Sequence, residues 1–156
     1  MTFALIAFGV GFVTGLRTLT AFTIASWAAR LGRLSLQGSW LAFLGYAATP
    51  WIMSLAALGE LVNDKLPKTP SRKTPPQFAA RILFGSVTGA AIGIANGMIA
   101  IGLLLGALGA VAGTLIGARA RARLVELTGG KDFPIALVED ATAIGLSVLL
   151  FFVFSA

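Results

Sequence analysis

The feature that most constrains the fold of this chain is a series of long apolar runs that carry almost no charge. Residues 98–118 contain no charged side chain at all. A helix needs about 20 such residues to cross a ~30 Å hydrocarbon core. Only 12% of the residues are charged, about half the roughly 25% of a soluble domain, so the apolar surface must face lipid. The runs are continuous rather than alternating, which favours helices over a transmembrane barrel. The sequence predicts an all-α, polytopic membrane bundle.

Five membrane spans are predicted within a single domain, residues 1–156. The first apolar stretch, 3–29, is longer than one perpendicular span. It is either one tilted helix or a span that ends near Thr20 and continues as an interfacial helix. The second span is predicted at 40–61 with a kink at Pro50. The others are predicted at 78–94, at 98–118 after an Asn-Gly turn, and from Asp132, a predicted N-cap, to about Phe154.

The basic residues are unequally divided between the two predicted sides of the membrane. A Pro/Lys-rich loop, 63–77, and a loop at 119–131 contain most of them, whereas the other side has Arg30 and Arg33. The side rich in lysine and arginine is normally cytoplasmic. With five spans, this predicts a cytoplasmic N-terminus, an external C-terminus and an inner or plasma membrane location. No basic segment precedes the first apolar run, so it is interpreted as a span rather than a cleaved signal peptide.

The chain has no cysteine and no histidine. This excludes disulfides, thiol chemistry, histidine or cysteine metal sites and any nucleophile activated by histidine. The remaining carboxylates match no metal-binding loop, and the glycines form no phosphate-binding motif because none follows a strand. We therefore expect no cofactor, no metal and no enzymatic activity. The basic residues flank spans, so nucleic acid is not an expected partner.

Glycines recur every four residues along three of the predicted spans. Small residues at this spacing make a flat face on which two helix backbones can approach closely. Tight packing of the third and fourth spans, or of two protomers, is the favoured interpretation; a glycine-lined passage is the alternative. The glycines predicted to pack are Gly11, Gly15, Gly85, Gly89, Gly93, Gly109, Gly113 and Gly117.

Two segments share one pattern and suggest an internal repeat. Each has two glycines four residues apart followed by an arginine, at residues 11–17 and 113–119. With five spans these helices would run in opposite directions, as in the inverted-topology repeats of many transporters.

Several charged residues fall inside or at the ends of the spans. Arginine at the membrane centre is costly, so Arg17 marks a functional-site candidate; its alternative is to extend to the headgroups. We predict one polar cluster, which either coordinates an ion or proton or orients the helices through ion pairs. Its predicted members are Arg17, Glu60, Asp64, Lys65, Arg81, Arg119, Glu139 and Asp140.

Three motifs make the chain resemble a known family over nearly its whole length. They are Gly-Leu-Arg-Thr at 15–18, Glu-Leu-Val-Asn-Asp-Lys-Leu-Pro at 60–67, and Glu-Asp-Ala-Thr-Ala-Ile-Gly-Leu at 139–146. The sequence resembles a widespread family of small integral membrane proteins catalogued only as a domain of unknown function. Members commonly have a proline after the first arginine, where this chain has Thr18, Leu19 and Thr20. The resemblance implies a multi-span helical fold and brings no activity with it. It singles out Arg17, Glu60, Asp64, Lys65, Glu139 and Asp140.

Two functions are compatible with these features. The leading hypothesis is a small transporter or channel-like protein for an unknown ion or solute. The alternative is a non-transporting membrane scaffold or lipid-binding protein in which the charges are structural. A chain this short encloses little volume, so we also predict that it assembles with itself in the bilayer.

Overall fold

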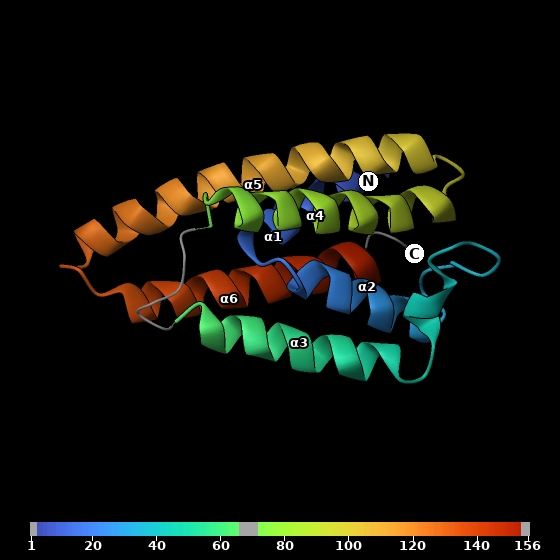
Figure 1. The fold of residues 1–156 in the computed structure, drawn as a ribbon, viewed down its shortest axis with the longest axis horizontal. Coiled ribbons are helices and arrows are strands. Elements are labelled where there is room, and N and C mark those ends of the chain that lie inside the picture. The colour runs from blue at the N-terminus through green and yellow to red at the C-terminus, as the bar shows by residue number, and fades with distance from the viewer. Residues whose placement is uncertain (1–2, 66–71, 154–156) are drawn as a thin grey trace.

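The computed structural model describes residues 3–65 and 72–153, and this part of the chain consists of helices joined by turns and irregular connections, with no strand (Figure 1). These described residues form six α-helices, together with a short 3-10 helix at Ala42–Gly45 and a π-helical turn at Leu149–Val153 that continues the last helix. The α-helices are α1 (Phe3–Leu16), α2 (Thr20–Arg30), α3 (Thr49–Asn63), α4 (Pro75–Ala95), α5 (Ile99–Leu127) and α6 (Asp132–Val148).

Within the described residues, three segments are long and apolar enough to cross a membrane: Pro75–Ala95, Ile99–Leu127 and Asp132–Phe152. Helix α1 is a shorter apolar helix. The predicted all-α, polytopic membrane bundle is confirmed.

The first apolar stretch is neither one tilted helix nor a span with an interfacial extension. The chain reverses at residues 17–19, so α1 enters the bundle and α2 runs back toward the end from which α1 came (Figure 1). Helix α2 lies inside the protein, because Ala21, Ala25 and Ala28 are fully buried. We call α1 and α2 together the re-entrant hairpin, and residues 17–19 its tip.

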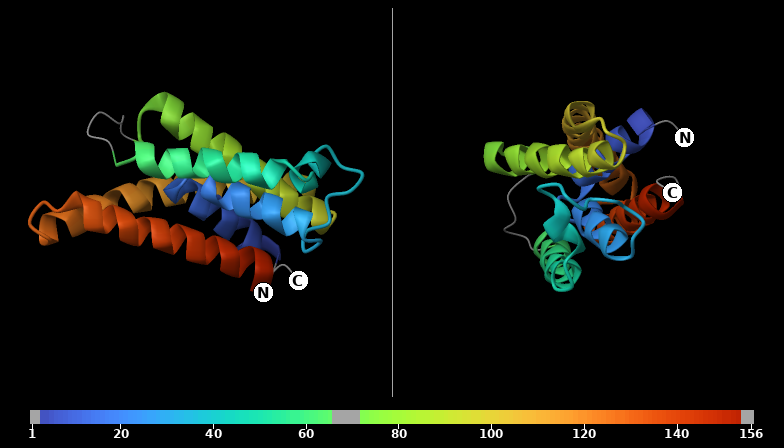
Figure 2. Two further views of the ribbon diagram at one scale, coloured as in Figure 1. Left: turned by 90° about the horizontal axis from the view of Figure 1, so that it is seen from below. Right: turned by 90° about the vertical axis from the view of Figure 1, so that its right-hand side faces the viewer.

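The re-entrant hairpin changes the topology. Since the chain reverses at the tip, the described chain begins and ends at one end of the bundle (Figure 2), where Leu150 packs beside Gly9. The C-terminal end of α3, the start of α4 and the α5–α6 connection lie at the other end (Figure 1). The prediction that the termini lie on opposite sides, with the N-terminus on the side of the basic loops, is therefore wrong.

Helices α1 and α5 run in the same direction. Gly11 lies against Gly106, and further along both helices Gly15 lies against Gly113. An inverted-topology repeat requires opposite directions. The similar patterns at 11–17 and 113–119 therefore arise from two parallel helices that pack on each other, which removes the basis for the predicted repeat.

The glycines allow α1, α4 and α5 to touch through their backbones. A Cβ atom at Gly11 would lie 2.1 Å from the carbonyl oxygen of Gly106, and one at Gly89 would lie 2.2 Å from that of Gly102. Among the glycines predicted to pack, Gly117 is the exception: the atom nearest to an added Cβ there belongs to the Leu16 side chain. At the other positions the nearest atom belongs to backbone or to a small alanine. The faces are filled by neighbouring helices, so these glycines line helix contacts rather than a passage. The other seven are Gly11, Gly15, Gly85, Gly89, Gly93, Gly109 and Gly113.

Two other predicted boundaries are wrong. Residues 40–48 are irregular apart from the 3-10 helix, and Pro50 lies in the first turn of α3 instead of kinking a longer helix. Proline has no N–H to donate and is favoured in a first helical turn. Residues 119–127 continue α5 rather than forming a loop, since alanine, arginine, leucine and glutamate are strong helix formers.

The remaining boundaries agree with the sequence more closely. The turn at Asn96-Gly97 is present, with Gly97 at φ +69°. Asp132 is the first residue of α6, where Lys131 occupies the cap position without a side-chain hydrogen bond. Part of the predicted loop 63–77, including Pro67 and Lys68, lies outside the described residues, as does Phe154.

Candidate functional site

The tip of the re-entrant hairpin places Arg17 at the centre of a cluster of charges. The Arg17 side chain is fully buried. Its Nη1 atom lies 2.5 Å from Asp64 Oδ2, and its Nη2 atom lies 2.5 Å from Asp140 Oδ1. A third carboxylate, that of Glu139, lies 3.8 Å from Nη2. These contacts are ion pairs without the angles of aligned hydrogen bonds, so Arg17 is held mainly by charge.

Glu60 and Arg81 hold the two helix ends that meet at the tip. Glu60, in α3, accepts hydrogen bonds from the backbone N–H groups of Thr18 (2.7 Å) and Leu19 (2.8 Å). A carboxylate at the N-terminal end of α2 also complements the helix dipole. Arg81, in α4, donates to the carbonyl oxygens of Gly15 and Leu16 at the C-terminal end of α1. Two side chains of opposite charge thus satisfy backbone groups that a continuous helix would pair internally.

A second layer of ion pairs surrounds Arg17. Lys65 Nζ lies 2.5 Å from Asp140 Oδ2, and Arg72 contacts Glu139 through both of its terminal nitrogens. Arg121, in α5, joins three carboxylates: it lies 2.7 Å from Asp64, 2.8 Å from Asp132 and 3.3 Å from Glu139. We call these side chains, with those that hold the tip, the ion-pair network. Its members are Arg17, Glu60, Asp64, Lys65, Arg72, Arg81, Arg121, Asp132, Glu139 and Asp140.

The ion-pair network has five basic and five acidic members, so its formal charge is zero. The whole chain has six acidic residues, and only Glu126 lies outside the network. Burying an unpaired charge costs far more than burying a paired one. The acidic side chains therefore balance the five cations that belong to the network.

The structure brings together seven of the eight predicted site residues. The exception is Arg119, which is exposed on α5 and has no ion pair among the described residues. Adjacent helical positions differ by ~100°, so Arg119 and Arg121 lie on nearly opposite faces of the helix. Arg121 continues the buried face of Gly113 and Gly117 at a spacing of four, and that spacing could have identified it.

Two other network members were missed for different reasons. The sequence predicts Asp132 only as a helix cap, whereas its carboxylate accepts hydrogen bonds from Arg121 through both oxygens. Arg72 follows a proline-rich segment with no periodicity, so no local signal distinguishes it from the lysines of that loop. Only its place beside Glu139 identifies it.

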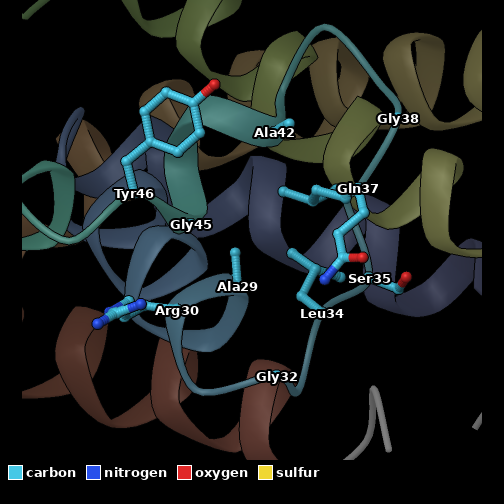
Figure 3. Close-up of a pocket in the computed structure, with 11 residues that line it drawn as sticks. Ala29, Arg30, Gly32, Leu34, Ser35, Gln37, Gly38, Ala42, Gly45 and Tyr46 are labelled. Atoms are coloured by element: carbon cyan, nitrogen blue, oxygen red, sulfur yellow. The ribbon is translucent and has the colours of Figure 1, made fainter.

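Three hollows lined by described residues lie beside the helices of this site and beside α2. One cavity, which is shallow and widely open to the surface, has a volume of about 450 Å³; it lies between α3 and α4 and is lined by Thr18, Leu19 and Glu60. A second cavity of about 500 Å³ lies at the far end of α2, beside Arg30 and Tyr46 (Figure 3). An apolar groove of about 200 Å³ lies between α5 and α6. Within the described residues, no group of three acidic side chains is placed to hold a metal ion.

A model of a family described as a domain of unknown function, DUF4126, matches residues 4–153. The chain belongs to the DUF4126 family. The match covers nearly the whole chain, as the three sequence motifs implied. No curated protein and no solved structure matches it.

Removing the Glu60 carboxylate from this DUF4126 chain is expected to loosen the tip. In the Glu60→Ala variant the N–H groups of Thr18 and Leu19 lose their acceptors, at a cost of about 1–3 kcal/mol of unfolding free energy. Hydrogen exchange at these two amides should accelerate, while exchange in α5 should change little. Glu126→Ala is the matched control, because Glu126 is the acidic residue outside the network. Equal exchange in both variants would contradict the role assigned to Glu60.

Proposed function

We propose that this protein moves a small polar solute or ion across the membrane along the interface of α2 and α3. The proposal involves no chemical reaction. Its main support is the re-entrant hairpin, because interrupted helices inside membrane proteins occur where backbone is buried in protein or lines a cavity. In many transporters, substrate sites are built from the ends of such interrupted helices.

The two cavities support a route along α2. The first lies at the N-terminal end of the helix, and Asn63 and Gln77 add polar groups to its wall. The second lies at the C-terminal end, with Arg30 and Tyr46 on one side and Ser35 and Gln37 on the other (Figure 3). Both volumes are within the range of small-molecule sites. Leu19 lines the first cavity and Ala29 the second, and these positions are ten residues apart, about 15 Å along the helix axis.

Polar side chains fill the interface between the two cavities. Thr23 donates a hydrogen bond to the carbonyl oxygen of Met53, and Ser26 donates one to that of Leu44. Trp27 Nε1 donates to Ser54 Oγ at 3.1 Å. We call these the polar seam. In this structure the polar seam is closed by its own hydrogen bonds, and a permeating solute would replace them as it passes.

We also propose an orientation of the bundle in the membrane. The ion-pair network and most basic residues lie at one end of the bundle, and by the positive-inside bias that end faces the cytoplasm. The cavity beside Glu60 then opens toward the cytoplasm, and both ends of the chain lie on the outer face of an inner or plasma membrane.

One observation favours the second candidate, a scaffold that transports nothing. The carboxylates of the ion-pair network all have basic partners, so the network as it stands has no charge left over for a substrate ion. Under this alternative the network only fixes the positions of the helices. Self-association of the chain stays a prediction for either function, and native mass spectrometry in lipid tests it.

Blocking the polar seam tests transport directly. In proteoliposomes, stopped-flow light scattering with glycerol and urea and ion-sensitive dyes with sodium, potassium and protons would measure permeability. We expect the wild type to raise permeability for at least one probe, and Ser54→Phe to return it to the level of protein-free vesicles because the ring fills the seam. Ser86→Phe, on α4 away from the seam, is the control. No flux with any probe, or equal flux in Ser54→Phe and the wild type, would favour the scaffold.

A further inference from the structure

The apolar groove between α5 and α6 opens on the outside of the bundle. Leu16 of α1 forms part of its floor, and Arg121 and Glu139 of the ion-pair network close one part of it. Its walls remain exposed in the folded chain: Ile116 is 52% and Val138 is 58% exposed. In a membrane such a surface is in contact with lipid. The apolar walls consist of Ile116, Ala120 and Leu124 of α5 and Ile135 and Val138 of α6.

The groove lies at the depth where acyl chains meet headgroups. Helix α5 is 29 residues long, or about 43 Å, which exceeds the ~30 Å hydrocarbon core. Its charge-free part, 99–118, spans about 30 Å and fits that core by itself. The arginines that follow must then lie in the headgroup layer, and the groove crosses this boundary.

Two arginines flank the groove at headgroup level. Arg119 comes three residues after Ile116 and one before Ala120. Arg123 comes three residues after Ala120 and one before Leu124. Both therefore lie at the outer edge of the α5 wall, on the side of Ile116 away from Arg121, and outside the groove lining itself. They are exposed, and neither has an ion pair among the described residues. Like charges four residues apart on a helix repel each other, so an anion between them would be stabilising.

We propose that this groove binds one anionic phospholipid. Its acyl chain lies along Ile116, Ala120 and Val138, and its phosphate contacts Arg119 and Arg123. Apolar contacts hold the acyl chain, and the two arginine charges select an anionic headgroup, as in basic sites between membrane helices. This site is separate from the polar seam, and it assigns a role to Arg119, which the ion-pair network leaves outside.

Native mass spectrometry of the full chain tests the site by titration with phosphatidylglycerol and, as reference, phosphatidylcholine. We expect one tightly bound phosphatidylglycerol and weaker binding of phosphatidylcholine. Each surface arginine contributes about a fivefold factor to the binding of an anionic lipid. The double variant Arg119→Gln/Arg123→Gln should therefore weaken phosphatidylglycerol binding about 25-fold. The matched control is Arg30→Gln/Arg33→Gln, which removes two exposed arginines at the other end.

A second pair of variants tests the acyl chain. Ala120→Phe fills the groove and should displace the lipid, whereas Ala100→Phe, an exposed position near the start of α5, should not. Both sites are exposed on one helix, so their folding should be equally unaffected. The proposal would be overturned if the two arginine double variants lost the same amount of phosphatidylglycerol affinity, or if Ala120→Phe still bound the lipid. It would also be overturned if soluble glycerol phosphate bound as tightly as phosphatidylglycerol. Binding of both lipids with the same affinity would do so as well.

Discussion

Replacing Arg17 with methionine is expected to destabilise the folded protein by about 3–5 kcal/mol. Methionine fills a similar volume but leaves the Asp64 and Asp140 carboxylates without their shared cation, in a site where the Arg17 side chain is fully buried. A protein of ordinary stability, about 5–15 kcal/mol, would lose much of its folded population. Thermal or detergent unfolding in lipid nanodiscs, followed by tryptophan fluorescence, measures the loss.

Two further variants separate the ion pairs from charge in general. Arg119→Met removes the same side-chain type from an exposed position without an ion pair, and should leave the unfolding transition where it is. Arg17→Lys keeps the charge, but lysine has no planar fork with which to reach both carboxylates. The stability of this variant should therefore lie between those of the wild type and Arg17→Met. Unchanged stability in Arg17→Met would contradict the central place of Arg17 in the network.

Replacing Gly106 with alanine is expected to cost at least about 1–3 kcal/mol, the range for overpacking a close-packed core. An added Cβ would lie 2.2 Å from the carbonyl oxygen of Gly85, and the carbonyl of Gly106 itself already faces Gly11. The obstacle is backbone on both sides, so α4 or α1 must move as a whole. Unfolding in mixed micelles with increasing denaturing detergent measures the change.

Gly59→Ala provides the matched control for this prediction. Gly59 lies inside α3, and a Cβ there would meet nothing within 4 Å. Alanine favours a helix over glycine by up to about 1 kcal/mol, so this variant should be slightly more stable than the wild type. A similar loss of stability in Gly106→Ala and Gly59→Ala would contradict the prediction, because it would mean that the close backbone contacts of Gly106 do not cause the destabilisation.

The sequence by itself determined the class of the protein and most of its ingredients. Apolar runs such as 98–118 require lipid, because nothing else can cover them. The four-residue glycine spacing predicts close helix contacts, and buried charges such as Arg17 require partners. These conclusions follow from single segments, since hydropathy and helical spacing act locally.

The tertiary structure decided how those segments pair. No proline or glycine breaks the chain at residues 17–19; the helix is interrupted there because Glu60 and Arg81, distant in sequence, take the place of its internal hydrogen bonds. The choice of Arg121 over Arg119 likewise depends on which face of α5 meets α1 and α6. A pattern within one segment contains no such information. The interactions of the tip and of the ion-pair network form only once all six helices and Arg72 have come together.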